Sequence, residues 1–262
     1  MNRPGPSVEK SSGERRRVAV LCDIHGNLPA LEAVLGEMAG ENVDEVIVGG
    51  DVLPGPMARE VLERLLALDV PVRFLHGNGD REALALFDGR SSGVPEAFRA
   101  SVRWSAEQLS PEQRQLVATW PPTLRVNVAG LGAVLCCHAT PRNDTEIFTR
   151  LTAEDRLRPI FEVVDAALVV CGHTHMAFDR MVGRVRVVNA GSIGMPFGAQ
   201  GADWLLLGPG VEPRHTNYDL SGAADRIRHT AYPEADEFAA QYVVTPPSEA
   251  KMLEVFAGAE LM

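Results

Sequence analysis

Short apolar runs alternate with helical patterns in the first half of the chain. The runs at 17–22, 45–49 and 72–76 are rich in Val, Leu and Ile and predict three strands. Between them, apolar residues recur at helical spacing after Asn27 and over 57–69, which predicts two amphipathic helices, the first with Asn27 as its N-cap. An alternation of strand and helix indicates an α/β fold with a parallel sheet.

The pattern changes twice beyond residue 80. Residues 81–120 predict helices, the last opened by a capping box of Ser110 and Gln113 and ended by Pro121. A helical pattern at 153–165 contains Pro159, which is expected to kink or split that helix. The remaining apolar runs predict strands at 123–128, 133–138, 167–171, 184–189, 203–207 and 213–218.

No linker, repeat or change of composition divides the 262 residues, so one domain is expected over 15–220. Residues 1–14 carry Pro, Gly, Ser and charge with almost nothing apolar, which predicts a disordered leader. The alanine-rich tail 221–262, broken at Pro233 and Pro246, is expected to be a helical appendage that packs on the same domain. Two alternatives stay open for the tail: it covers a site, or it forms a subunit contact in a homo-oligomer.

Composition narrows the possible partners. The chain has 35 acidic and 25 basic residues and a formal net charge of −10, which repels polyphosphate backbones, so duplex nucleic-acid binding is not expected. The apolar run before Asp23 is too short for a signal peptide or a membrane span, so no membrane contact and a cytoplasmic location are expected. A reducing compartment is also indicated because all four cysteines lie inside apolar runs, at Cys22, Cys136, Cys137 and Cys171.

Five of the apolar runs are followed directly by polar side chains. In an open α/β sheet, ligands bind beyond the carboxyl ends of the strands, so side chains far apart in the sequence can converge there. The set supplies oxygen and nitrogen donors and no thiolate, which suits divalent transition-metal ions, namely Mn, Fe, Zn, Co or Ni. Its members are Asp23, His25, Asp51, Asn78, His138, His173 and His175.

Seven ligands are too many for one ion, which predicts a pair of ions, and the count divides evenly if Asp51 bridges them. The set then divides into Asp23, His25, Asp51 and His175 for one ion and Asp51, Asn78, His138 and His173 for the other. Two cations about 3.5–4 Å apart can hold a bridging hydroxide and clamp a phosphate during in-line attack. Each motif alone is weak, because an Asp after a strand is an ordinary turn residue; their joint order favours the binuclear site.

The ordered motifs resemble those of the calcineurin-like metallophosphoesterases. D-x-H, G-D, G-N-x-D, H and G-H-x-H are matched by the residues from Asp23 to His175, and the phrases DIHGNLPALEAVL and NAGSIGMP are similar to the small bacterial branch. The resemblance spans roughly residues 17 to 220. It implies a four-layer α-β-β-α sandwich of two mixed sheets flanked by helices, with the metal pair at one end. It also implies hydrolysis of a small phosphoester substrate and the same division of ligands.

One position departs from the family pattern. Where many relatives have G-N-H-D or G-N-H-E, with the His acting on the leaving group, this chain has Gly79. Relatives without that His are associated more with diesters, so the resemblance implies a phosphodiester preferred over a monoester. The stretch Gly50–Pro56 lacks the Asp-Arg pair of the protein phosphatase branch, which makes a protein phosphatase a weaker alternative. A catalytically weak regulatory or binding protein on the same scaffold is the other alternative.

Five further residues complete the predicted site. Asp80 is expected to orient groups around the ligands. His76 is a candidate for the missing acid, although a structural histidine in the strand is the simpler interpretation. Candidates for substrate contact are Asn27, Arg142 and Asn143, of which the last two lie in the polar loop after His138, where a surface loop without contact is the alternative.

Overall fold

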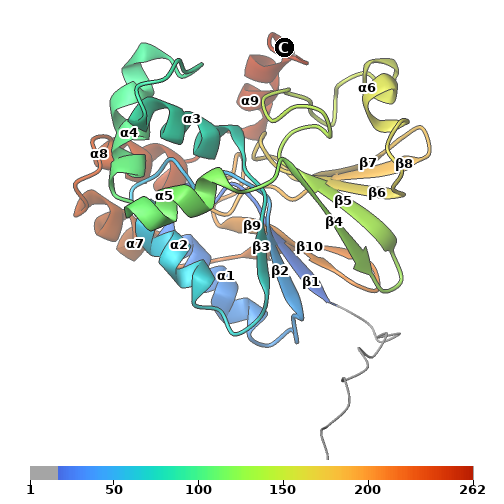
Figure 1. The fold of residues 1–262 in the computed structure, drawn as a ribbon, viewed down its shortest axis with the longest axis horizontal. Coiled ribbons are helices and arrows are strands. Elements are labelled where there is room, and N and C mark those ends of the chain that lie inside the picture. The colour runs from blue at the N-terminus through green and yellow to red at the C-terminus, as the bar shows by residue number, and fades with distance from the viewer. Residues whose placement is uncertain (1–16, 262) are drawn as a thin grey trace, which may run out of the picture.

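The computed structural model describes residues 17–261 as two five-stranded sheets packed face to face, with helices on the outer faces (Figure 1). The expected four-layer sandwich of two mixed sheets is confirmed. The predicted leader, residues 1–14, lies outside the described residues.

The first sheet has the order β10-β9-β1-β2-β3. The three strands from the first half of the chain, β1, β2 and β3, are parallel, as the strand–helix alternation predicts. β9 pairs antiparallel with β1, and β10 pairs antiparallel with β9. β1 and β2 are buried along their whole length, as continuous apolar runs require. The bounds are β1 Val18–Leu21, β2 Glu45–Val48, β3 Val72–Phe74, β9 Ala202–Leu207 and β10 Val211–Thr216.

The second sheet has the order β4-β5-β6-β8-β7, with β5, β6 and β8 parallel and the two edge strands antiparallel. The apolar runs predicted every strand except β7, which lies at the edge and alternates between exposed and half-buried side chains. Its sequence FDRMV therefore carries no continuous apolar signal. The bounds are β4 Thr123–Val128, β5 Gly132–Cys137, β6 Leu168–Cys171, β7 Phe178–Val182 and β8 Val185–Asn189.

The core between the sheets consists of small and branched side chains from their inner faces, among them Val20 of β1, Val134 of β5 and Leu205 of β9. Alternate residues of the same strands point to the outer faces and pack against helices. The four cysteines are buried and free, as the sequence predicts. Cys22 and Cys136 lie between the sheets, and Cys137 and Cys171 lie on the outer face of the second sheet.

Helices cover the outer face of the first sheet (Figure 1). The predicted N-cap of α1 and the capping box of α5 are both present: Asn27 Oδ1 accepts from Ala30, and the Ser110 and Gln113 side chains bond each other's backbone N–H. α3 begins earlier than predicted, so Asn78 and Asp80 occupy its first turn. The bounds are α1 Leu28–Met38, α2 Ala58–Leu66, α3 Asn78–Phe87, α4 Arg99–Glu107 and α5 Pro111–Ala118, with a 3₁₀ turn at Glu96–Phe98.

One helix covers the outer face of the second sheet. α6 (Glu154–Phe161) runs through Pro159, so the split that the sequence allowed does not occur, while the alternative of a kink stays a prediction; the helix ends four residues before the predicted 165. Pro159 is the sixth residue of this short helix, so its missing N–H removes one hydrogen bond, to Asp155.

The tail is helical in pieces with breaks at the predicted prolines. α7 and α8 pack on the core beside the first sheet through Ile227 and Phe238, whereas α9 lies at the end of the sandwich where the parallel strands terminate (Figure 1). The segments are α7 Leu220–Arg228, α8 Ala235–Phe238, a π-helical stretch Ala239–Val244 and α9 Glu249–Ala257. Within the described part of the chain, no helix has the length and apolar character that crossing a membrane requires.

Candidate metal centre

The loops that follow β1, β2, β5 and β6 meet at one end of the sandwich. Backbone hydrogen bonds tie them together: the N–H of Asp23 donates to Gly50 O (3.1 Å) and the N–H of Gly172 donates to His138 O (2.8 Å). Each bond joins one strand tip to its neighbour in the sheet. Strand pairing therefore brings the predicted ligands together within each sheet, and the packing of the two sheets joins the two groups although they are scattered in the sequence.

Asp23, His25 and His175 form the first cluster. Nε2 of His25 lies 3.1 Å from Nε2 of His175, and Nε2 of His175 lies 3.2 Å from Oδ1 of Asp23. All three side chains are buried, and their ligand atoms lie within 4.8 Å of one another. Three converging donors of this kind leave further coordination positions open for water or substrate.

Asp23, Asp51 and His138 form a second cluster with the same spacing of ligand atoms. Oδ2 of Asp51 lies 3.5 Å from Nε2 of His138 and 3.6 Å from Nε2 of His25, so this oxygen is within reach of both clusters. Asp23 Oδ1 is also 3.9 Å from His138 Nε2, and Asp23 is the residue common to both sets. Either carboxylate has a position between the clusters, and the assignment of Asp51 as the bridge stays a prediction.

Asn78 and His173 lie beside the second cluster. Asn78 Oδ1 is 3.1 Å from His138 Nε2. The ring of His173 lies 5.0 Å from that of His138, and its Nε2 is 3.3 Å from the carbonyl oxygen of Thr145. A bond from Nε2–H to this carbonyl leaves Nδ1 as the atom with a lone pair for a metal. Both residues are in place as neighbours of the centre, and their ligand roles stay predictions.

One oxygen of each aspartate is held by the backbone. Asp23 Oδ2 accepts from the N–H of His173 (2.9 Å), and Asp51 Oδ1 accepts from the N–H of Gly79 (2.8 Å). Asp23 Oδ1, in contrast, is buried and has no hydrogen-bond donor among residues 17–261. A buried carboxylate oxygen without a partner is costly, and a cation removes that cost. The residues present therefore fit a bound metal.

The protonation equilibria point to the same need for positive charge. Burial by itself lowers the pKa of His138, but the carboxylates of Asp51 and Asp23 reverse this and raise it to about 10. Burial raises the pKa of Asp51, and the neighbouring His138 and His25 outweigh it and hold that pKa well below its usual range. The buried carboxylates thus stabilise whatever cation lies between them.

Backbone strain is concentrated at the centre. Five of the seven predicted ligands have a positive φ between 47° and 70°, a region that costs a non-glycine residue about 1–3 kcal/mol. The sharp turns that end the strands impose this conformation and aim consecutive side chains at one point. The strained ligands are Asp23, His25, Asp51, His173 and His175.

Asp80 holds the loop that carries Asp51. Its buried carboxylate accepts three backbone N–H groups, from Asp51 (2.8 Å), Gly77 (2.9 Å) and Leu53 (2.9 Å). It also lies in the first turn of α3, where a carboxylate is favoured by the helix dipole. These contacts are of the kind that the expected orienting role requires, because the Asp80 carboxylate binds the backbone of the loop that carries Asp51 rather than the ligand side chain.

Asp80→Asn should weaken metal binding about 10–100-fold, the range typical of residues that hold metal ligands in place. The amide replaces one carboxylate oxygen with an NH₂ group, which faces a backbone donor and cannot accept from it. Metal titration by calorimetry measures the change. The exposed Asp88→Asn, at the end of the same helix, is the control, and equal affinity in both variants would contradict the role of Asp80.

Gly79 occupies the position of the missing motif histidine. A Cβ there would collide with the carbonyl oxygen of Leu53 and come within 2.9 Å of Asp51 Oδ1. The backbone of the ligand loop therefore occupies the space that a side chain needs, so the loop would have to shift to admit one, and Gly79 itself supplies no acid.

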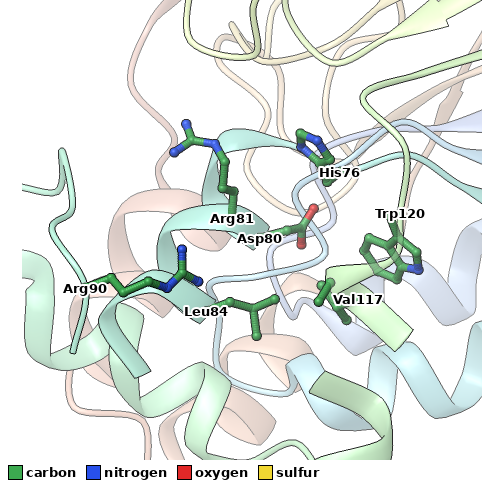
Figure 2. Close-up of a pocket in the computed structure, with 8 residues that line it drawn as sticks. His76, Asp80, Arg81, Leu84, Arg90, Val117 and Trp120 are labelled. Carbon is green, nitrogen blue, oxygen red and sulfur yellow. The ribbon is translucent and has the colours of Figure 1, made fainter. Parts of the chain in front are cut away.

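His76 and Asp144 lie beside the centre. A cavity of about 350 Å³ has the ligand His138 in its wall together with His76, Arg81 and Asp144. His76 Nδ1 is 3.5 Å from Asp144 Oδ2, and the guanidinium of Arg81 bonds both oxygens of Asp144 (2.8 and 3.1 Å). Figure 2 shows His76, Asp80 and Arg81 around a neighbouring cavity of about 260 Å³. The sequence offered no signal for Arg81, which lies on the exposed side of α3.

The predicted substrate residues differ in their placement. Arg142 and Asn143 line the same 350 Å³ cavity; Arg142 pairs with Glu146, and Asn143 Oδ1 accepts from the backbone of Thr145 and Glu146. Asn27 is fully buried, and its Nδ2 donates to Gly194 O (3.0 Å) while Oδ1 caps α1. The structure thus gives Asn27 a role in holding loops together, and these contacts do not support substrate binding.

Two residues of the NAGSIGMP phrase support the ligands without being predicted individually. Ser192 Oγ donates to the carbonyl oxygen of Asp23 (2.7 Å), and Asn189 Nδ2 donates to Gly172 O (2.6 Å). Both are buried and connect the end of β8 to the strained turns. Only the phrase as a whole carried a signal for them, because a Ser or Asn in a turn is ordinary.

Comparisons with known proteins agree with this geometry. An uncharacterized protein of Methanocaldococcus jannaschii is 25% identical over 242 residues, which are 83% of this chain and 94% of that protein. The crystal structure of a hypothetical protein from Pyrococcus horikoshii has a TM-score of 0.74 at 24% identity and covers 88% of this chain and 99% of its own. A metallophosphoesterase from Sphaerobacter thermophilus has a TM-score of 0.69 at 25% identity, with coverages of 88% and 100%.

The sequence model of the family described as the calcineurin-like phosphoesterase superfamily domain matches residues 17–208, which include every predicted metal ligand. The resemblance that the motifs carry is therefore confirmed. The chain belongs to the calcineurin-like phosphoesterase superfamily, a family of metal-dependent phosphoester hydrolases.

Proposed function

We propose that this protein hydrolyses small phosphate esters with two divalent transition-metal ions, and that it prefers diesters to monoesters. The observation that carries the proposal is the pair of buried carboxylate–imidazole clusters with Asp23 Oδ1 left without a donor among the described residues. Ions bound there would supply activation of water and stabilisation of the charge that develops on the phosphate oxygens.

The donor set decides which ions fit. Asp23, His25 and His175 would hold one ion, and Asp51, Asn78, His138 and His173 the other, with Asp51 shared. Mixed oxygen and imidazole donors favour Mn, Fe, Zn, Co or Ni over Ca or Mg, which prefer oxygen alone. Metal analysis of the purified protein identifies the resident ions.

The chain's own residues position the substrate and the proton. The 350 Å³ cavity beside His138 presents Arg142 and Asn143, which we assign to the phosphate ester's substituents. Oδ2 of Asp144 lies 3.5 Å from Nδ1 of His76 in the same cavity, and His76 is the candidate that gives a proton to the leaving oxygen. Gly79 cannot do so, and a diester with a good leaving group needs this proton least.

Protein loaded with Mn²⁺ and offered an aryl phosphodiester, an aryl phosphomonoester and a phosphopeptide tests the proposal. Hydrolysis of the diester ahead of the monoester is the expected result. No hydrolysis of any substrate, with two ions shown to be bound, would instead favour the regulatory or binding protein on this scaffold. A preference for the phosphopeptide would favour a protein phosphatase.

His76→Gln should lower the rate about 10²-fold for alkyl esters and much less for p-nitrophenyl esters, because a general acid matters most for a poor leaving group. Initial rates over a series of leaving groups measure this dependence. The exposed His229→Gln, at the end of α7, is the control. Equal losses across the series would assign His76 to the fold rather than to proton transfer.

The surroundings proposed for the enzyme follow from its charge and its cysteines. Four buried free thiols suit the reducing cytoplasm, and a net charge of −10 suits small substrates rather than duplex nucleic acid. A homo-oligomer is compatible with this location and with this charge. Light scattering of the purified protein measures the mass of the assembly.

A further inference from the structure

A second cavity adjoins the metal centre on the side of His25. It has a volume of about 220 Å³, and His25 and Pro54, whose carbonyl oxygen is 3.2 Å from His25 Nδ1, are part of its wall. The opposite wall comes from the tail, between α7 and the π-helical stretch. A group bound in this cavity would therefore lie next to a phosphate held at the centre. The cavity on the side of His138 is a different one, lined by other residues.

Aromatic rings from the tail line this cavity and pack edge to face against one another, so they form no parallel slot. Tyr232 and Phe238 meet at an interplanar angle of 89°, and Phe238 and Tyr242 meet at 61°, with centroids 6.1 and 5.5 Å apart. Phe98, which is 47% exposed, lies at the same cavity. Rings at these angles offer no pair of parallel faces between which a flat base could stack, and a compact group that touches single ring faces or edges fits them better.

The charge of the cavity is negative. Glu234 and Glu237 belong to its wall, and no Lys or Arg is found among the described residues that line it. Within residues 17–261, neither carboxylate forms an ion pair; Glu237 accepts only from the side-chain amide of Gln241 (3.0 Å). Burial raises the pKa of Tyr242, and the charges of Glu237 and Glu234 raise it further, which reports the same negative field.

Aromatic faces and carboxylates together are the recognition chemistry of organic cations. We propose that this cavity is a subsite for an alkylammonium group on the substrate, so that the preferred substrate is a phosphoester of a cationic amino alcohol. Tyr232, Phe238 and Tyr242 would contact the methyl or methylene groups, and Glu234 and Glu237 would balance the charge. The assignment rests on the proposed phosphoesterase function for its substrate, and on the cavity alone for its binding of the cation.

Two diesters of the same shape test the subsite. p-Nitrophenyl phosphocholine and p-nitrophenyl 3,3-dimethylbutyl phosphate differ only in carrying nitrogen or carbon at the branched centre. In both, water adds to phosphorus, the bond from phosphorus to the aryl oxygen breaks, and p-nitrophenolate leaves. We expect kcat/KM to be about tenfold higher for the cationic ester with the Mn²⁺-loaded protein.

The double variant Glu234→Gln, Glu237→Gln should lower this ratio several-fold, since it removes the carboxylate charges and keeps the shape and the aromatic rings of the cavity. The matched control is Glu60→Gln, an exposed residue of α2 that does not line the cavity, and it should keep the tenfold ratio. Equal kcat/KM for the two esters in the unaltered protein would overturn the subsite while leaving the phosphoesterase intact.

Binding without turnover separates the two proposals. Choline chloride titrated into protein without added metal, followed by calorimetry, should show saturable binding that the double variant loses and that 3,3-dimethylbutanol does not reproduce. Choline binding without hydrolysis of either ester would support the subsite and contradict the phosphoesterase. Hydrolysis of both esters without choline binding would support the phosphoesterase and contradict the subsite.

Discussion

Asp51→Asn should abolish hydrolysis of phosphate esters and lower the metal content at both positions together. Oδ2 of Asp51 lies 3.6 Å from His25 Nε2 and 3.5 Å from His138 Nε2, so one substitution alters both clusters. In the Asp51→Asn variant, the amide oxygen can take the place of Asp51 Oδ1 and accept from the N–H of Gly79. The substitution therefore preserves the hydrogen bond that holds the ligand loop. The loss of rate should exceed the 10–100-fold typical of a residue behind the ligands.

Metal content by elemental analysis, with initial rates on an aryl phosphodiester, measures both effects in the same sample. Asp69→Asn, an exposed residue after α2, is the control and should change neither. Loss of a single ion with the other retained at full stoichiometry would sink the assignment of Asp51 as the bridge and favour Asp23, the residue common to both clusters.

Gly79→Ala should destabilise the fold by about 1–3 kcal/mol, the range for an overpacked interior, and also weaken metal binding. The added Cβ meets the backbone carbonyl of Leu53 and lies 2.9 Å from Asp51 Oδ1, so the ligand loop must shift to admit it. Urea unfolding followed by circular dichroism measures the free energy of unfolding, and calorimetry measures the metal affinity.

Gly36→Ala is the matched control in α1. A Cβ at Gly36 meets nothing within 4 Å, and alanine in a helix interior is favoured over glycine, so this variant should gain about 0.5–1 kcal/mol. If Gly79→Ala were as stable as the unaltered protein and bound metal equally well, the position would be open to a side chain. Steric exclusion would then not explain why position 79 carries glycine instead of the motif histidine.

The C-terminal tail contributes side chains to the cavity beside His25. Its composition predicted helical pieces and nothing about chemistry, yet Tyr232 and Tyr242 line the cavity beside His25. The end of the tail also contacts α6, where Arg156 pairs with Glu260, and the loop after His138, where the N–H of Leu261 donates to Ile147 O. Side-chain contacts across 100 residues carry no periodic signal, and the pattern of the sequence therefore could not reveal them.

Local patterns predicted most elements because their signals are local. The apolar runs of β1 and β2, the N-cap at Asn27 and the box at Ser110 depend on neighbours within four residues. The elements that were missed or misjudged depend on context. β7 is an edge strand without a buried run, and α6 continues through Pro159, which removes one hydrogen bond of the helix, to Asp155.

The sequence by itself determined the family, the order of strands and helices in the first half, and the donor types of the centre. Asp, Asn and His at strand ends define which metals fit, since that choice depends on atom type alone. Tertiary structure decided which of these atoms meet. The face-to-face packing of the two sheets brought together strand tips up to 150 residues apart, as His25 after β1 and His175 after β6 show, and strained turns aimed their side chains. Long-range packing also closed the space at Gly79 and placed tail carboxylates beside the site, because such contacts depend on distances in space and not on spacing along the chain.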